Sequence, residues 1–287
     1  MSRFAYVNGC YVPHVAARVH IEDRGFQFAD GVYEVVTIVN GRLIDQEGHM
    51  LRLERSLRAL KMTPPMGRRP MELIMRELTQ RNHVRHGLLY LQITRGVAPR
   101  DFKFPKPVRG TLVMTTRSVA AFATSSQRED GVAVITIPDI RWKRCDIKSV
   151  SLLPNVLGKQ QAVEAGAFEA WQVDDDGLVT EGCSSNAWIV TRDGVLVTRR
   201  ADHDILNGVT RLSILRLAEA AGIRFEERSF SVAEAYEARE AFLSSATTFV
   251  TAVTRIDGLT IGDGRPGDLG RRLRQAYLET VGQWHEQ

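Results

Sequence analysis

Residues 141–155 read Arg141-Trp-Lys-Arg-Cys-Asp-Ile-Lys148-Ser-Val-Ser-Leu-Leu-Pro154-Asn155, and they decide how the rest of the sequence is interpreted. Lys148 ends an alternating, strand-like run between Ile147 and Val150, and the Pro-Asn pair then begins a helix. Apolar neighbours remove water from an ammonium group and so favour the neutral amine, which is the nucleophilic form. Lys148 is therefore a candidate nucleophile, although a surface lysine that extends to solvent explains the same residues.

A candidate acceptor carboxylate follows in Thr180-Glu181-Gly-Cys-Ser-Ser-Asn186. Glu181 stands beside a cluster of hydroxyls between two expected strands, so these groups are expected to surround its carboxylate. A hydrated hairpin is an equally good interpretation of this stretch when it is considered alone.

A candidate phosphate site lies at Asn207-Gly208-Val209-Thr210-Arg211, which leads directly into a helix. The free N–H groups, the hydroxyl and the positive dipole of such a helix start suit an anion of phosphate size. Simple capping of the helix by Thr210 or Asn207 is the alternative. Ser244–Thr248 follows another expected strand and offers further hydroxyl donors.

Together, a nucleophilic amine, a carboxylate and two anion-binding turns describe a site for pyridoxal phosphate. The aldehyde of this cofactor needs a lysine, its pyridine nitrogen needs a carboxylate that keeps it protonated, and its phosphate needs a helix start with hydroxyls. These residues suit this cofactor, although their spacing alone does not distinguish it from other ligands.

Composition excludes several other classes of protein. The chain has 287 residues and a mass of 32.1 kDa, with 44% hydrophobic and 25% charged residues, which is typical of a folded protein of one or two domains. The three cysteines lie far apart without CxxC spacing, so neither a disulfide framework nor a zinc site is expected. No histidine pattern suggests a metal ligand set, and no apolar stretch is long enough for a membrane span. A cytoplasmic enzyme without a metal is the resulting expectation.

Positive charge motivates one hypothesis from a different class. The net charge is +4 with an isoelectric point near 9.1, and 32 of the 38 cationic side chains are arginines, since only six are lysines. A nucleic-acid-binding protein is nevertheless not expected, because these arginines are scattered and aromatic residues make up only 7%.

The order of expected elements favours a mixed α+β fold with two domains, because strands and helices alternate without a regular βαβ repeat. Strands are expected at 5–12 (as a hairpin), 32–39, 87–94, 110–116, 132–137 and 241–245, and helices at 49–60, 70–82, from 154, 207–221 and 268–281. Small and polar residues replace the β-branched runs at 118–131. This change predicts an N-terminal α/β domain at 1–119, a linker at 120–130 and a C-terminal cofactor-binding domain at 131–287.

The sequence also resembles the fold-type IV pyridoxal-phosphate enzymes, which are class IV aminotransferases, and among them the bacterial D-amino-acid aminotransferases. The likeness extends over nearly the whole chain. Its collinear matches are Asp23–Val36, His49–Leu53, Gln92–Gly96, Arg141–Lys159, Thr180–Asn186 and Gly208–Arg211. It implies a smaller N-terminal α/β domain, a larger C-terminal domain, and a homodimer that acts on small amino acids and 2-oxo acids.

The same resemblance implies a role for each matching site residue. Lys148 would be the catalytic residue, which forms the Schiff base and then moves the proton of the substrate. Glu181 would pair with the pyridinium nitrogen, and Tyr33 and Arg100 would receive the substrate carboxylate. The other expected cofactor-binding residues are Arg52, Leu206, Val209, Thr210, Ala246 and Thr247.

Two departures from the family pattern bear on substrate preference. Arg100-Asp101-Phe102 replaces an Arg-x-His pattern, so the second carboxylate donor is missing, and Phe102 is expected to lower carboxylate affinity or favour larger apolar substrates. Ala246 stands where a threonine is usual, which leaves its main-chain N–H as the phosphate donor. Ser245 or Thr247 is expected to compensate.

Three relatives of the same fold are the alternatives to a D-amino-acid aminotransferase. A branched-chain L-amino-acid aminotransferase is disfavoured by Gly31–Val36, which lacks the Phe-Glu-Gly of that family. An R-amine transaminase is disfavoured by Arg100, because this side chain suits a carboxylate. Aminodeoxychorismate lyase is the third alternative.

Overall fold

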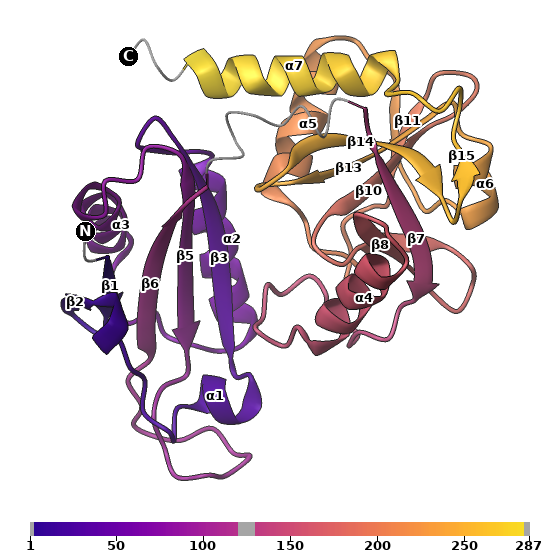
Figure 1. The fold of residues 1–287 in the computed structure, drawn as a ribbon. Coiled ribbons are helices and arrows are strands. Elements are labelled where there is room, and N and C mark those ends of the chain that lie inside the picture. Colours follow the sequence, from indigo (N-terminus) through magenta and orange to yellow (C-terminus); the bar gives the residue numbers. More distant parts are fainter. Residues whose placement is uncertain (1–2, 120–129, 284–287) are drawn as a thin grey trace. The chain divides into compact units, whose positions relative to one another are not determined.

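The computed structural model describes residues 3–119 and 130–283, and within them the chain forms two compact units (Figure 1). The N-terminal unit contains the described residues before the gap together with Ile147–Ser151. The C-terminal unit contains those after the gap up to Asp146, together with Leu152 and the residues that follow. The predicted linker at 120–130 lies almost entirely outside the described residues, so the domain limits stay a prediction.

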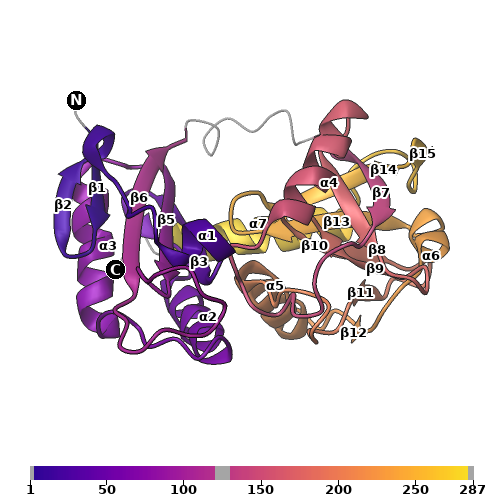
Figure 2. The ribbon, with the colours of Figure 1, turned by 90° about the horizontal axis from the view of Figure 1, so that it is seen from below.

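The N-terminal unit is an antiparallel sheet with helices on one face (Figure 2). Its strand order is β2 (Cys10–Pro13), β1 (Phe4–Val7), β6 (Thr111–Ser118), β5 (Gly87–Thr94), β3 (Gly31–Val39) and β4 (Arg42–Leu43). Helices α2 (Gln46–Ala59) and α3 (Arg68–Arg81) pack against the sheet, and the short helices η1 (His14–Ala16) and α1 (Arg24–Phe28) precede β3. Alternate residues of β3, β5 and β6 point toward these two long helices and form a single apolar core.

The C-terminal unit is built on a mixed sheet of nine strands. Its order is β12 (Phe225–Glu227), β11 (Leu196–Thr198), β10 (Asn186–Val190), β13 (Glu240–Ser245), β14 (Phe249–Ile256), β7 (Val132–Pro138), β8 (Glu169–Val173) and β9 (Val179–Gly182), with β15 (Leu259–Thr260) beside β14. The pairs β11–β12, β14–β7 and β7–β8 are parallel, and the others are antiparallel. Its helices are α4 (Leu153–Glu164), α5 (Val209–Ala220), α6 (Val232–Tyr236) and α7 (Asp268–Gln283).

Strand β10 is buried on both of its faces, which explains its continuous apolar run. Ala187 and Ile189 join a core cluster with residues of β8 and α6, whereas Trp188 and Val190 join a second cluster with α5 and α7. Figure 1 shows α5 and α7 close together beside strands β13 and β14. Because successive side chains of a strand alternate in direction, a strand covered on both sides loses its polar positions.

The predicted mixed α+β class with two domains is confirmed, and so are the expected strands and helices named above, within a few residues at their ends. Strand β14 is absent from the sequence prediction. It occupies the middle of the larger sheet, between β13 and β7.

Candidate functional site

Lys148 belongs to an irregular segment that an isolated antiparallel bridge between Ser149 and Val32 joins to β3, so the strand-like run expected to end at Lys148 is not formed. The main-chain N–H of Tyr33 donates to the carbonyl of Lys148 at 3.0 Å, and the N–H of Val150 donates to the carbonyl of Gly31 at 3.1 Å. The Lys148 Nζ lies 3.3 Å from the Tyr33 hydroxyl and 4.3 Å from the centre of its ring. The structure therefore brings together two predicted site residues, and Tyr33 contacts the lysine amine itself.

Arg52, the predicted phosphate ligand on α2, is held by a buried carboxylate that the sequence prediction did not assign. Glu34 accepts hydrogen bonds from Arg52 Nε at 2.8 Å and Nη2 at 2.7 Å, and its Oε2 lies 2.7 Å from His49 Nδ1. Burial alone would raise the pKa of Glu34, but the charge and hydrogen bonds of Arg52, with help from His49, lower it to about 2. Glu34 thus fixes the guanidinium of Arg52 in one orientation.

Arg100 lies on an exposed loop of the N-terminal unit. Its guanidinium carbon is 4.6 Å from the ring centre of Phe28, and the same ring lies 5.5 Å from the ring of Phe102. Arg24 anchors this loop, because its Nη1 donates to the carbonyl of Asp101. The ring of Phe28 therefore forms an aromatic support for Arg100, and Phe102 packs against that ring.

Glu181 lies on β9 and is almost completely buried. Its Oε1 accepts from Arg141 Nη1 and from the main-chain N–H of Leu206 at 3.0 Å, and its Oε2 accepts from Asn186 Nδ2 at 3.0 Å. The same Asn186 amide donates to the carbonyl of Leu206 at 2.9 Å. Two predicted cofactor residues, Glu181 and Leu206, are thus joined directly.

The hydroxyls near Glu181 have a different partner from the one that the sequence predicts. Ser184 Oγ and Ser185 Oγ donate to Glu169 Oε2 at 2.6 and 3.3 Å, and Lys159 Nζ lies 3.4 Å from Glu169 Oε1. Glu169 is therefore the carboxylate within the hydroxyl cluster. The expectation that these serines surround Glu181 is wrong, because the turn at 183–185 directs them toward β8.

The start of α5 has the features of an anion site. Gly208 precedes the helix, no side chain caps it, and Val209 and Thr210 form its first turn. The Thr210 hydroxyl is buried, and among the described residues it has no hydrogen-bond partner. A buried hydroxyl without a partner costs about 1–3 kcal/mol, so a ligand that accepts from it would remove this cost. This observation fits the phosphate of pyridoxal phosphate.

The turn after β13 carries the remaining two predicted cofactor residues, Ala246 and Thr247. Ser245 Oγ lies 3.2 Å from Thr247 Oγ1 and 2.8 Å from Thr248 Oγ1, and it accepts from the N–H of Thr248 at 3.1 Å. The Ser245 hydroxyl therefore stabilises the turn itself. Because Ser244 pairs in register with Asn186, this turn begins next to the Glu181 cluster.

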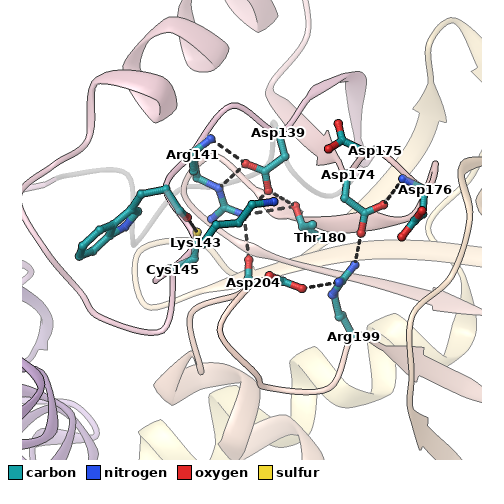
Figure 3. Close-up of a pocket in the computed structure, with 11 residues that line it drawn as sticks. Asp139, Arg141, Lys143, Cys145, Asp174, Asp175, Asp176, Thr180, Arg199 and Asp204 are labelled. Carbon is teal, nitrogen blue, oxygen red and sulfur yellow. Dashed lines mark hydrogen bonds and ion pairs between the residues drawn. The ribbon is translucent and has the colours of Figure 1, made fainter.

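A polar pocket of about 180 Å³ adjoins that cluster within the C-terminal unit (Figure 3). Asp139, Arg141 and Thr180 line one part of it, and Arg199 with its partners Asp174 and Asp204 lines another. Among the described residues no group of three or more histidine, cysteine, aspartate or glutamate side chains has an arrangement suited to a metal ion. Over the same part of the chain, no helix has the length and apolar character to span a membrane.

The sequence prediction missed three residues that hold the predicted ones. Glu34 holds Arg52, whereas Arg141 and Asn186 hold Glu181. A signal was present for Glu34, because it shares a strand face with the buried Val32 and Val36.

Comparison with known proteins defines the class. The family model for class IV aminotransferases matches residues 31–256, and the chain belongs to this family. It is 41% identical to a D-alanine aminotransferase of Bacillus licheniformis over 96% of this chain and 95% of the relative, and 39% identical to one of Listeria monocytogenes with the same coverage.

Solved structures agree on the fold. A branched-chain amino acid aminotransferase of Escherichia coli superposes with a TM-score of 0.89 at 23% identity, covering 97% of this chain and 94% of the other. A hypothetical aminotransferase of Mycobacterium tuberculosis, in a PLP-bound form, superposes with a TM-score of 0.81 at 24% identity, covering 95% and 96%. The fold-type IV architecture that the sequence predicts is therefore confirmed.

Proposed function

We propose that this chain transfers the amino group of a D-amino acid to a 2-oxo acid, with pyridoxal phosphate as cofactor. The near full-length likeness to D-alanine aminotransferases carries the proposal, since identity of about 40% extends over 96% of the chain. The branched-chain relatives share the fold at lower identity, 23% in the example from Escherichia coli. D-Alanine and D-glutamate are the donors that we expect.

Each predicted site residue has a role in this proposal. Bound pyridoxal phosphate supplies an aldehyde that captures amines and a ring that withdraws electrons from the substrate Cα. Lys148 would hold the cofactor through its amine and would move the proton at the substrate Cα, while the Tyr33 hydroxyl would orient that amine. Glu181 holds a proton on the ring nitrogen.

The other roles concern anions. Arg52, Val209 and Thr210 would hold the phosphate together with Ala246 and Thr247, and Leu206 would support the ring. Arg100 binds the substrate carboxylate, because a planar guanidinium can donate two parallel hydrogen bonds. The aromatic support under Arg100 limits its motion and favours this geometry.

We further propose a cytoplasmic homodimer. Large apolar side chains are exposed on the described surface of each unit, including Phe26 at 75%, Leu153 at 68% and Val163 at 60%. Several exposed apolar side chains on one helix, such as Leu153 and Val163 of α4, are typical of surfaces that a second protein covers. Sedimentation analysis is expected to give about 64 kDa, twice the chain mass of 32.1 kDa; a species of one chain mass would contradict the dimer.

A substrate comparison tests the function. D-Alanine, L-alanine, L-leucine and an R-amine are each supplied with 2-oxoglutarate as acceptor, and product is measured by chromatography. D- and L-glutamate are supplied with pyruvate instead, because amino transfer from D-glutamate to 2-oxoglutarate gives no net product. We expect turnover of the two D-amino acids at rates at least about 100-fold above those of their L-counterparts, a difference of about 2.7 kcal/mol in transition-state binding. Turnover of L-leucine without turnover of D-alanine would overturn the proposal.

A further inference from the structure

Arg141 occupies the centre of a buried charge cluster that neither the family match nor the predicted site residues explain. Its Nη1 donates to Glu181, while its Nε and Nη2 donate to the two oxygens of Asp139 at 2.9 and 2.6 Å. The side chains of all three residues are at most 10% exposed. Arginine thus makes its two-pronged contact with Asp139 and only a single-pronged contact with Glu181.

Asp139 changes the net charge of the cluster around Glu181. Glu181 and Arg141 alone would cancel each other and leave no charge for a ligand. Asp139 adds a second carboxylate, so the three side chains together keep one negative charge (two carboxylates and one guanidinium). A buried group with net charge is unfavourable unless a partner of opposite charge is present. The pairing of Arg141 with Asp139 therefore leaves the charge of Glu181 less neutralised than Arg141 alone would leave it, which favours a cation beside Glu181.

The surroundings of Asp139 hold it in the ionised form. Burial alone would raise the pKa of Asp139, but hydrogen bonds and charge from Arg141, with a further hydrogen bond from Thr180, keep the pKa below its usual value. Thr180 Oγ1 lies 2.7 Å from Asp139 Oδ2, and Arg141 Nη2 also donates to the carbonyl of Asp204 at 3.0 Å. Figure 3 shows Asp139, Arg141 and Thr180 gathered at one end of the polar pocket.

We propose that Asp139 is a positioning residue, which acts through Arg141 to preserve the negative charge of Glu181 for a protonated ring nitrogen. The proposal rests on the assignment of Glu181 to the ring nitrogen in the proposed function. Asp139 touches neither the cofactor nor the substrate in this scheme. Its effect is electrostatic, because its carboxylate neutralises the charge of Arg141, which would otherwise cancel the charge of Glu181.

The test measures binding to the cofactor-free enzyme at pH 8 with two ligands, pyridoxal phosphate and its 1-deaza analogue, in which carbon replaces the ring nitrogen. Only the natural cofactor can carry the ring proton, so the ratio of the two dissociation constants isolates the charge at Glu181. In Asp139→Asn, we expect the preference for the natural cofactor to fall about tenfold, the order for one lost charge in a partly buried site. In Arg141→Gln, the loss of the cationic side chain should raise the preference for the natural cofactor.

A matched control is Asp204→Asn, because Asp204 lines the same pocket but its carboxylate pairs with Arg199. This variant should leave the ratio unchanged. If Asp139→Asn weakens both ligands equally, or if both variants move the ratio in the same direction, Asp139 has only a structural role and the proposal is wrong. If the wild-type enzyme itself has no preference for the natural cofactor, the assignment of Glu181 fails, and the proposal fails with it.

Discussion

Thr210 combines a buried hydroxyl with the absence of any hydrogen-bond partner among the described residues. Replacement by valine keeps the shape and removes the unpaired group. We therefore expect Thr210→Val to stabilise the cofactor-free protein by about 1 kcal/mol and to weaken pyridoxal phosphate binding about tenfold. Urea unfolding of the cofactor-free protein and a fluorescence titration measure the two effects. Loss of stability with unchanged cofactor affinity would show that the hydroxyl serves the fold.

Glu34 gives the fold a dependence on pH. Its pKa of about 2 lies below the ordinary value of 4.5, so its contribution to stability is complete above about pH 4.5 and is lost as the pH falls toward 2. We expect Glu34→Gln to lower the free energy of unfolding by about 3 kcal/mol at pH 7, with a smaller difference at pH 3. Urea unfolding of both proteins across this range is the measurement. A difference that does not change with pH would contradict the ion-pair account.

Residue identity at the site was only partly predictable from sequence. Chemistry makes Lys148 and Glu181 candidates for holding an aldehyde and a ring nitrogen, and the resemblance to the family then selects them. Their partners depend on contacts between distant segments: Glu169 rather than Glu181 accepts from the two serines, and Arg141 reaches Glu181 from 40 positions away. The local sequence does not show which of two carboxylates, Glu169 or Glu181, will accept hydrogen bonds from these serine hydroxyls.

At the scale of elements, a side chain from the sheet caps the N-terminus of helix α7. Glu240 of β13 accepts from the N–H of Leu269 at 3.1 Å and of Gly270 at 3.0 Å, and so caps the helix. A Cβ at Gly267 would lie 2.0 Å from the Glu240 carboxyl carbon, so only glycine leaves room for this cap. The element thus depends on one carboxylate and one glycine.

We expect Glu240→Ala to destabilise the protein by about 1–2 kcal/mol, because two buried N–H groups lose their acceptor. Gly267→Ala should have a similar effect through displacement of the same carboxylate. Glu237→Ala is the control, since that side chain is exposed and its nearest charge pair spans 3.8 Å. Thermal unfolding compares the three variants. Equal melting temperatures for the Glu240 and Glu237 variants would refute the capping role.

Most elements could be predicted because their apolar periodicity is local. Helices α2, α3 and α5 and strands β3 and β5 each have a clear periodic pattern and defined ends. The order of strands is a different kind of information. Strand β14 pairs antiparallel with β13 but parallel with β7, more than 100 residues earlier in the chain, and no turn signal indicates a pairing of that range.

At the scale of the whole molecule, the segment that contains Lys148 belongs to a different unit from its neighbours along the chain. Ile147–Ser151 follows the first strand of the C-terminal sheet in sequence but packs with the N-terminal unit, where Ile147 enters the apolar core. A change of composition along the sequence predicts one domain boundary. It does not show that five residues beyond that boundary pack with the N-terminal unit again. Lys148 thus stands on the backbone of one unit while the chain on both sides of it belongs to the other.

The central claim is that Lys148 carries the cofactor of a D-amino-acid aminotransferase. Borohydride reduction of the protein with bound pyridoxal phosphate, followed by peptide mass analysis, tests it most directly, with Lys143→Ala as a control from the same segment. The account predicts a single phosphopyridoxyl group on Lys148 in both proteins, lost when the enzyme is first given excess D-alanine. A label on any other lysine, or a label that D-alanine does not displace, would contradict it.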